Sequence, residues 1–128
     1  MPEKSGMHLY EYAVVRYMPR VEREEFVNVG LVMMCKRRRW IRVGMKIDAA
    51  KIAALCPCAD MDNAAAQLDA FRIVAEGKAP YTSGLEVHER FRWLTAVRSA
   101  CVTTSRPHPG ICQDLDGTFD RLFAELVE

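Results

Sequence analysis

The hydrophobic positions in the first third of the chain follow the patterns of β-strands: an apolar run on both faces early, and alternation with a period of two later. Residues 8–18 are rich in β-branched and aromatic side chains, and they end before Pro19, which has no N–H for a strand ladder. Both faces of this segment are largely apolar, as in a strand that is covered on both sides. The pattern therefore predicts a first strand in the middle of a sheet.

Two more strands follow, and they predict a hairpin with a basic turn. In residues 26–35, the apolar side chains at the odd-numbered positions 27 to 35 share one face, and Asn28 and Gly30 lie on the other. A glycine inside a strand often marks a bulge or a close backbone approach, and Asn28 is a candidate to satisfy a backbone group there. Residues 40–47 alternate most regularly, and the basic residues 36–39 form the turn before them.

The period changes near Asp48 to the spacing of amphipathic helices. Asp48 is the candidate N-cap of a short helix that ends before Pro57. Asp60 or Asp62 can cap a longer helix, and Gly77 fits the C-terminal stop of that helix.

The last third of the chain predicts two further helices around a short strand. Ser83 and Glu86 have the spacing of a capping box, and Asp116 is the candidate cap of the last helix. Residues 101–104 fit a short strand. Residues 106–110 contain two prolines and a glycine, so we expect them to be irregular.

This order of elements predicts an α+β fold: a small, mainly antiparallel sheet of three N-terminal strands plus a short fourth, packed with three to four helices. A chain of 128 residues suits one domain, which we expect to span residues 1–128 with a flexible N-terminus over residues 1–7. Half of the residues are hydrophobic, which excludes a wholly disordered chain.

Charge and cysteine content narrow the class of protein. The 18 basic and 17 acidic residues give a net charge of +1, which argues against a general polyanion binder. We see no secretory signal and no apolar run that could span a membrane, so we expect a cytoplasmic protein. The five cysteines are an odd number, which fits a reducing compartment better than a disulfide framework.

His108 and Cys112 are the candidate catalytic residues, because a cysteine nucleophile needs a nearby base. Asp114 or Asp116 can orient the imidazole in such an arrangement. The same residues also fit a turn with a packed thiol, which is the usual place of a free cysteine. We favour this turn with a packed thiol over a catalytic pair.

A metal site is the second candidate for chemistry, with Cys56 and Cys58 joined by Cys112 and His108 as ligands. Structural zinc sites generally use pairs of cysteines with about two to four residues between them, and Cys-Pro-Cys is tighter than that. We therefore expect no metal, and we identify no cofactor.

The basic hairpin turn is a candidate nucleic-acid site. Arg37 and Arg38 lie in the turn, Trp40 follows and can stack on a base, and Arg42 extends from the third strand. A solvated turn that discourages edge-to-edge aggregation explains the same residues. The small net charge favours the solvated turn.

A further polar set contains Arg16 and Asn28, together with Arg92 and Arg98. The acidic loop, residues 22–25, can pair with the arginines around Arg92. Such a network is either a polar pocket or partner contact, or a set of surface ion pairs worth about 0–1 kcal/mol each.

Three segments resemble a bacterial family, the domain of unknown function 3037 family. The opening of that family is similar to residues 12–35, YAVVRYMPRVEREEFVNVGLVMMC, and its second block resembles residues 89–114, ERFRWLTAVRSACVTTSRPHPGICQD. Its closing helix matches DRLFAELV. Family members often read Ala-Pro-Arg and Gln-Thr at positions where this chain reads Ala96-Val97-Arg98 and Thr103-Thr104.

The resemblance implies a partner rather than a reaction. The family has no established activity, cofactor or catalytic residue, and its members are often encoded beside a HipA-like kinase. We therefore expect a non-enzymatic accessory or protein-interaction module, with a HipA-like kinase as candidate partner. The alternatives are a nucleic-acid-binding module that uses residues 36–39 and a small Cys/His-dependent enzyme.

Overall fold

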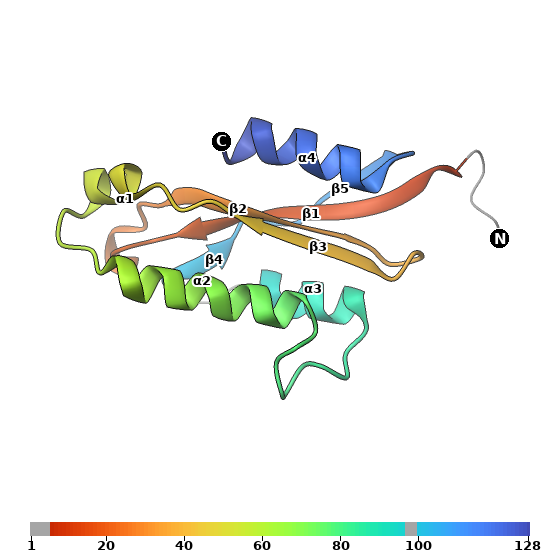
Figure 1. Ribbon diagram of the computed structural model, residues 1–128, viewed down its shortest axis with the longest axis horizontal. Coiled ribbons are helices and arrows are strands. Elements are labelled where there is room, and N and C mark those ends of the chain that lie inside the picture. The colour runs from red at the N-terminus through yellow and green to blue at the C-terminus, as the bar shows by residue number, and fades with distance from the viewer. Residues whose placement is uncertain (1–5, 97–99) are drawn as a thin grey trace.

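The computed structural model describes residues 6–96 and 100–128 of the chain. The described residues form an α+β fold with five strands and four α-helices (Figure 1). The elements are β1 (His8–Tyr17), the short 3-10 helix η2 (Val21–Arg23), β2 (Val27–Cys35), β3 (Trp40–Met45), α1 (Ala49–Leu55), α2 (Met61–Ala75), α3 (Val87–Thr95), β4 (Val102–Thr104), β5 (His108–Cys112) and α4 (Leu115–Leu126). The fold class predicted from the sequence is confirmed.

The sheet is antiparallel, and β1 lies at its centre. The strand order is β3-β2-β1-β4, and β5 also pairs with β1. One edge of β1 is filled by β2, while the other is shared between β4 and β5. The central position explains why β1 is apolar on both faces, and the β2–β3 hairpin is confirmed.

The expectation that residues 106–110 are irregular is wrong, because β5 runs from His108 to Cys112. Within the described residues β5 pairs with β1 alone, and proline is tolerated on such an edge strand. The strand also needs a glycine, since Tyr10 faces Gly110 across the pair. A Cβ on Gly110 would collide with the Tyr10 ring and its hydroxyl oxygen.

Ser105 continues the hydrogen bonding of β1 between β4 and β5. Its N–H donates to the Val14 carbonyl at 2.9 Å, and its Oγ accepts from the Val14 N–H at 2.9 Å. The same hydroxyl donates to the Arg106 carbonyl at 3.0 Å. Ser105 is buried. The backbone of Val14 thus keeps both partners where the chain passes from one strand to the next.

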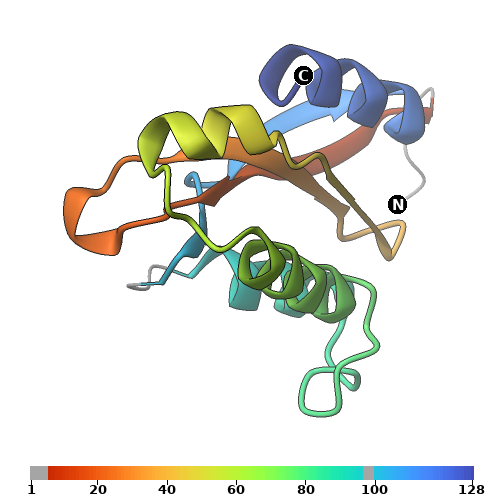
Figure 2. The ribbon, with the colours of Figure 1, turned by 60° about the vertical axis from the view of Figure 1, so that its left-hand side comes forward.

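Helices cover both faces of the sheet, with α2 and α3 on one side and α4 on the other (Figure 2). A separate hydrophobic cluster lies on each side. The larger contains Ala13, Val15, Val29, Val32, Met34, Ile52, Leu68, Phe71, Phe91 and Leu94. The smaller contains Tyr10, Leu31, Met33, Phe119, Leu122 and Val127.

The expected single apolar face of the second strand is wrong, because β2 contains a bulge. Val15 pairs with Gly30 and Arg16 with Asn28, so Val29 is an extra residue in β2. Val29 therefore joins the larger cluster, whereas Leu31 packs toward α4. The glycine was the signal for this bulge.

Gly30 lies where two backbones approach closely. A Cβ on Gly30 would lie 2.6 Å from the Gly44 carbonyl oxygen and 2.5 Å from the Met45 sulfur. Both alternatives that the sequence suggested for this glycine, a bulge and a close approach, are confirmed.

Two of the predicted helix caps are confirmed. Asp48 accepts from two N–H groups of α1, and Asp60, rather than Asp62, accepts from the Asn63 N–H. Gly77 follows α2 with a φ of +77°, as expected for a helix stop.

The caps predicted for the last two helices are wrong. The chain before α3 continues as a loop past Ser83, and Glu89 accepts from the Glu86 N–H at 2.9 Å, so Glu86 is the cap. Asp114 caps α4 by accepting from the Gly117 N–H at 3.0 Å. Asp116 lies in the first turn of α4 instead, where a carboxylate favours the helix dipole.

Candidate functional site

The predicted basic residues of β3 hold α4 against the sheet. Arg42 donates to Asp116 at 3.0 Å and to Asp120 at 3.1 Å, and its guanidinium lies 4.3 Å from the centre of the Phe119 ring. Trp40 is half-buried and packs on the smaller cluster. The positive charge of Arg42 is thus balanced by α4.

The hairpin turn presents Arg37 and Arg38 to solvent, as predicted. Arg39 approaches Glu86 of α3, with 3.9 Å between the charged atoms. Part of the positive charge of the turn is therefore balanced by the helix beneath it.

Asn28 connects β2 to the end of α4. Its side-chain amide donates to the Leu126 carbonyl at 3.1 Å, near the C-terminal end of α4. The expectation that Asn28 satisfies a backbone group at the bulge is wrong, because the group that it bonds belongs to α4. This bond also fixes where α4 ends above β2.

His108 and Cys112 do not meet. They are four residues apart on one strand, which at a rise of about 3.3 Å per residue separates them by roughly 13 Å. The His108 ring lies 5.2 Å from the Tyr12 ring, and Cys112 packs on the smaller cluster. The candidate Cys/His dyad is therefore wrong, because β5 is extended where a turn was needed to join them.

The candidate metal ligands also lie apart. The Cys56 and Cys58 sulfurs are 3.6 Å from each other at the end of α1, near Tyr17. Cys112 pairs with His8 at the opposite end of β1. The four-ligand arrangement is therefore wrong, and within the described ranges no group of three or more His, Cys, Asp and Glu residues could hold a metal ion.

Among the described residues, the predicted ion pairs between the acidic loop and α3 do not form. Glu22 pairs with Arg20 at 3.1 Å and Glu25 with Arg23 at 2.6 Å, so these two carboxylates are paired within the loop region. Arg92 is exposed on α3. Arg98 lies outside the described residues.

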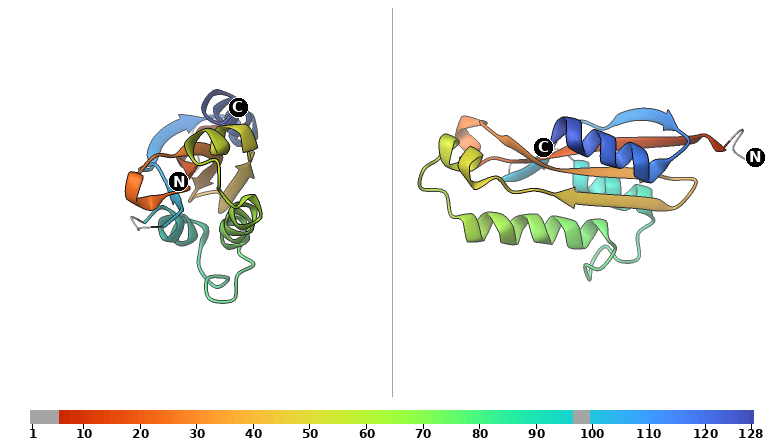
Figure 3. Two further views of the ribbon diagram at one scale, coloured as in Figure 1. Left: turned by 90° about the vertical axis from the view of Figure 1, so that its left-hand side faces the viewer. Right: turned by 45° about the horizontal axis from the view of Figure 1, so that its top comes forward.

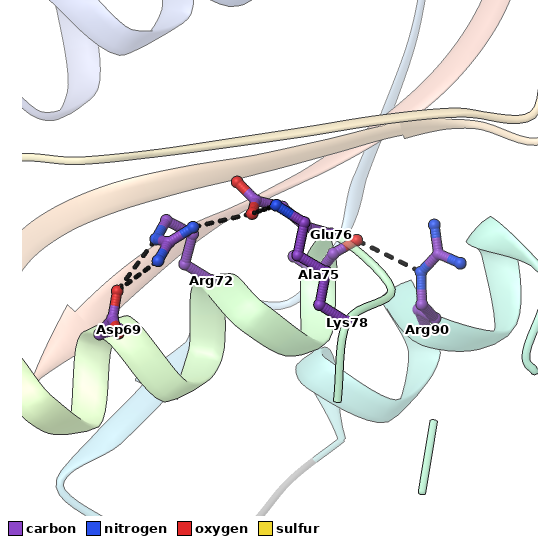
Figure 4. A network of polar contacts seen from close by, with 6 residues as sticks. All are labelled: Asp69, Arg72, Ala75, Glu76, Lys78 and Arg90. Carbon is purple, nitrogen blue, oxygen red and sulfur yellow. Dashed lines mark hydrogen bonds and ion pairs between the residues drawn. The ribbon is translucent and has the colours of Figure 1, made fainter. Parts of the chain in front are cut away.

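Arg90 links α3 to the end of α2 instead of reaching the acidic loop, residues 22–25 (Figure 4). It donates to the Ala75 carbonyl at 3.2 Å and to the Leu85 carbonyl at 3.0 Å. Beside it, Arg72 bridges Asp69 and Glu76, and the hydrogen bond to Asp69 raises the pKa of this guanidinium. These arginines stabilise the pair of helices.

Arg16 lines a cleft of about 290 Å³ at the C-terminal end of β1. Its guanidinium lies 4.2 Å from the centre of the Phe26 ring, a cation–π contact. Thr103 of β4 is the cross-strand partner of Arg16, and Glu24 and Arg106 also line the cleft. Of the predicted polar set, the structure therefore places Arg16 alone in this cleft among the residues it describes.

The second exposed feature is the apolar end of the sheet, made by Leu9 and Ile111 beside a cavity of about 200 Å³ that Leu9, Pro109 and the buried Met34 line. Leu9 and Ile111 face each other across β1 and β5, and they are 66% and 63% exposed. This end of β1 projects past α2 and α3 (Figure 3). Sequence reasoning missed it because β5 was not expected.

Comparison with protein families identifies the class to which this α+β domain belongs. Residues 12–127 match the family described as "Protein of unknown function (DUF3037)". The match covers nearly the whole chain, so the protein belongs to this family, as the resemblance of its motifs indicated. No curated protein and no solved structure matches the chain. No described helix is long and apolar enough to cross a membrane.

Proposed function

We propose that this chain is a non-enzymatic protein-interaction module and that its partner binds the apolar end of the sheet. The observation that carries the proposal is the pair of apolar side chains Leu9 and Ile111, which are directly opposite and mostly exposed. Isolated exposed apolar residues are common, but a contiguous group beside a cavity is typical of an interaction site.

The composition of this surface supports a partner that inserts an apolar side chain. Met34 and Pro109 line the cavity with Leu9, while Glu11 and Lys36 add one charge of each sign at its border. An apolar centre with a polar border is the usual anatomy of a protein interface. Pro109 has no N–H to offer on the open edge of β5, which favours contact with the face of the sheet over addition of a strand.

The candidate partner is a HipA-like kinase, which the family resemblance suggests. A nucleic-acid partner is the second candidate, supported by exposed Arg37 and Arg38 in the hairpin turn. It is less favoured because Arg39 and Arg42 already have acidic neighbours. A protein partner and the cytoplasmic location remain predictions.

The experiment is a purification of the tagged protein from its own cell, followed by binding assays with a purified HipA-like kinase from the same cell. Ile111→Glu places a charge at the centre of the apolar end and should lower kinase binding at least tenfold, or about 1.4 kcal/mol. Tyr81→Glu is the matched control, because Tyr81 is 98% exposed in the loop between α2 and α3. It should bind as the unchanged protein does.

Three results would contradict the proposal. The first is equal kinase binding by the Ile111→Glu variant and the control. The second is recovery of nucleic acid that is lost on charge reversal at Arg37 and Arg38 and released by salt. The third is a dimer of this chain that Ile111→Glu dissociates, since the surface would then serve a second copy.

A further inference from the structure

Arg16 has a charged group partly withdrawn from water without an anion to balance it. Its Nε is buried and has no hydrogen-bond partner, and within the described residues the guanidinium makes no ion pair. A buried donor that lacks an acceptor is costly, and a charged one more so. Such a group requires an explanation, and an absent ion or ligand is a standard one.

The groups around Arg16 form a positively charged cleft. Arg106 lines it as a second guanidinium and has no ion-pair partner in the described part of the chain. Thr103 and Thr104 add hydroxyl groups that can donate hydrogen bonds. Among the described lining residues, Glu24 is the single carboxylate, so two guanidinium groups face one negative charge there.

We infer that the cleft around Arg16 binds the phosphate group of a small phosphorylated molecule. Guanidinium groups donate two parallel hydrogen bonds to oxyanions, and the Arg16 guanidinium lines the cleft 4.2 Å from the centre of the Phe26 ring. A phosphate monoester offers three acceptor oxygens. The cleft offers donors on two arginines and two hydroxyls. These donors match the three oxygens of a phosphate monoester better than the two oxygens of a carboxylate.

The cleft also has an apolar wall and a size that limit the ligand. Phe26, Met18 and Ala96 line it beside the polar groups. Its volume of about 290 Å³ is just below the range of about 300–1,000 Å³ for ligand sites. The apolar wall therefore suits a small organic group attached to the phosphate.

This site is separate from the proposed protein interface. Arg16 lies seven positions after Leu9 in β1, or roughly 23 Å along an extended strand. The alternation of the strand places the two side chains on opposite faces. Failure of one proposal therefore leaves the other intact.

The experiment titrates the ¹⁵N-labelled full chain with inorganic phosphate, phenyl phosphate and acetate at low salt and follows the amide signals by NMR. We expect phosphate to shift the signals of Arg16, Thr103 and Thr104. Phenyl phosphate should bind more tightly because its ring reaches the apolar wall, and acetate should bind at least tenfold more weakly than phosphate.

Two substitutions test the charges of the cleft. Arg16→Met keeps an unbranched side chain on Phe26 and should weaken phosphate binding at least tenfold. Arg92→Met removes the same charge from an exposed site on α3 and should change binding less than twofold. Glu24→Gln removes the carboxylate of the cleft and should strengthen phosphate binding about threefold. This variant tests the charges of the cleft even if Arg16→Met does not fold.

The inference is overturned if about 10 mM phosphate leaves these signals unchanged, since a Kd near 1 mM would give nearly full binding there. Equal weakening by Arg16→Met and Arg92→Met would also overturn it, because binding would then follow net charge. Acetate binding as tight as that of phosphate would assign the cleft to carboxylates instead.

Discussion

The helices leave the sheet bare at two places, which lie at opposite ends of β1 and differ in chemistry. At the N-terminal end, Leu9 and Ile111 are exposed although nothing about them is polar. At the C-terminal end, Arg16 is partly withdrawn from water although it is charged. Exposed apolar area is unfavourable at the first place, and a charge partly withdrawn from water is unfavourable at the second. A different kind of molecule would remove each of these costs. A protein can cover the first, and a small anion can neutralise the second.

The largest effect is expected at the bulge that positions the cleft. Gly30→Ala places a Cβ 2.6 Å from the Gly44 carbonyl oxygen, so the two strands must separate. We expect the free energy of unfolding to fall by about 3 kcal/mol, measured by urea denaturation. Gly84→Ala is the control, because a Cβ there meets nothing within 4 Å.

The same variant tests whether the two places are independent. Where Gly30→Ala remains folded, it should weaken phosphate binding at the cleft and leave kinase binding at the apolar end unchanged. Loss of both together would show that the bulge shapes the whole sheet. A fall in stability equal to that of Gly84→Ala would contradict the close approach.

A smaller loss is expected beneath the apolar end. Gly110→Ala brings a Cβ against the Tyr10 ring, a side chain that can move at some cost, so we expect a loss of about 2 kcal/mol by urea denaturation. Tyr10→Ala removes the obstacle, and the double variant should therefore lose less than the sum of the two single changes. Additive losses would show that Tyr10 does not restrict position 110.

The junction between the two strand segments should contribute less again. Ser105→Ala leaves the buried Val14 N–H without its acceptor, and we expect a loss of about 1.5 kcal/mol. Ser83→Ala, at an exposed loop position, should change stability by less than about 0.5 kcal/mol. Equal unfolding midpoints for the two variants would show that the Ser105 hydroxyl does not support β1.

The smallest effect concerns pH, through two tyrosines at the two ends of β1. Burial raises the pKa of Tyr10 and of Tyr17, and the thiols of Cys112 and Cys101 respectively raise them further. The unfolded chain therefore ionises first. The resulting stability is fully present below the ordinary value of 10.0 and is lost as the pH rises through the folded-state pKa.

Urea denaturation at a series of pH values above 9 should show this loss, and Tyr17→Phe should reduce its slope. Tyr10→Phe should do so as well. A slope that both variants leave unchanged would assign the alkaline loss to other groups.

Much of the fold is predictable because local patterns determine it. The alternation of residues 40–47 indicated β3, and the carboxylates of Asp48 and Asp60 marked the starts of α1 and α2. In each case, the deciding contact lies within a few residues along the chain. The central position of β1 was also readable, because only a strand with two covered faces is apolar on both.

The errors arise where distant segments decide the outcome. One extra residue in β2 moves Leu31 to the face opposite Val29, and no local signal besides Gly30 marks that shift. The strand β5 forms despite Pro109 because β1 lies beside it. Of the residues that line the cleft, Arg16 was predicted from the sequence. Arg106 was not, because the pairing of β4 with β1 brings it there.

The central strand β1 is synthesised first, but the strands that fill its second edge are synthesised much later. Val102, the first described residue to pair with the second edge of β1, comes 85 positions after its partner Tyr17. At a synthesis rate of about 5–20 residues per second, that edge waits roughly 4–17 s for a partner. During this interval β1, β2 and β3 can form a three-stranded meander whose open side is β1, a strand with apolar residues on both faces. The nascent chain is then most exposed to aggregation, and the short strands β4 and β5 end that exposure when they arrive.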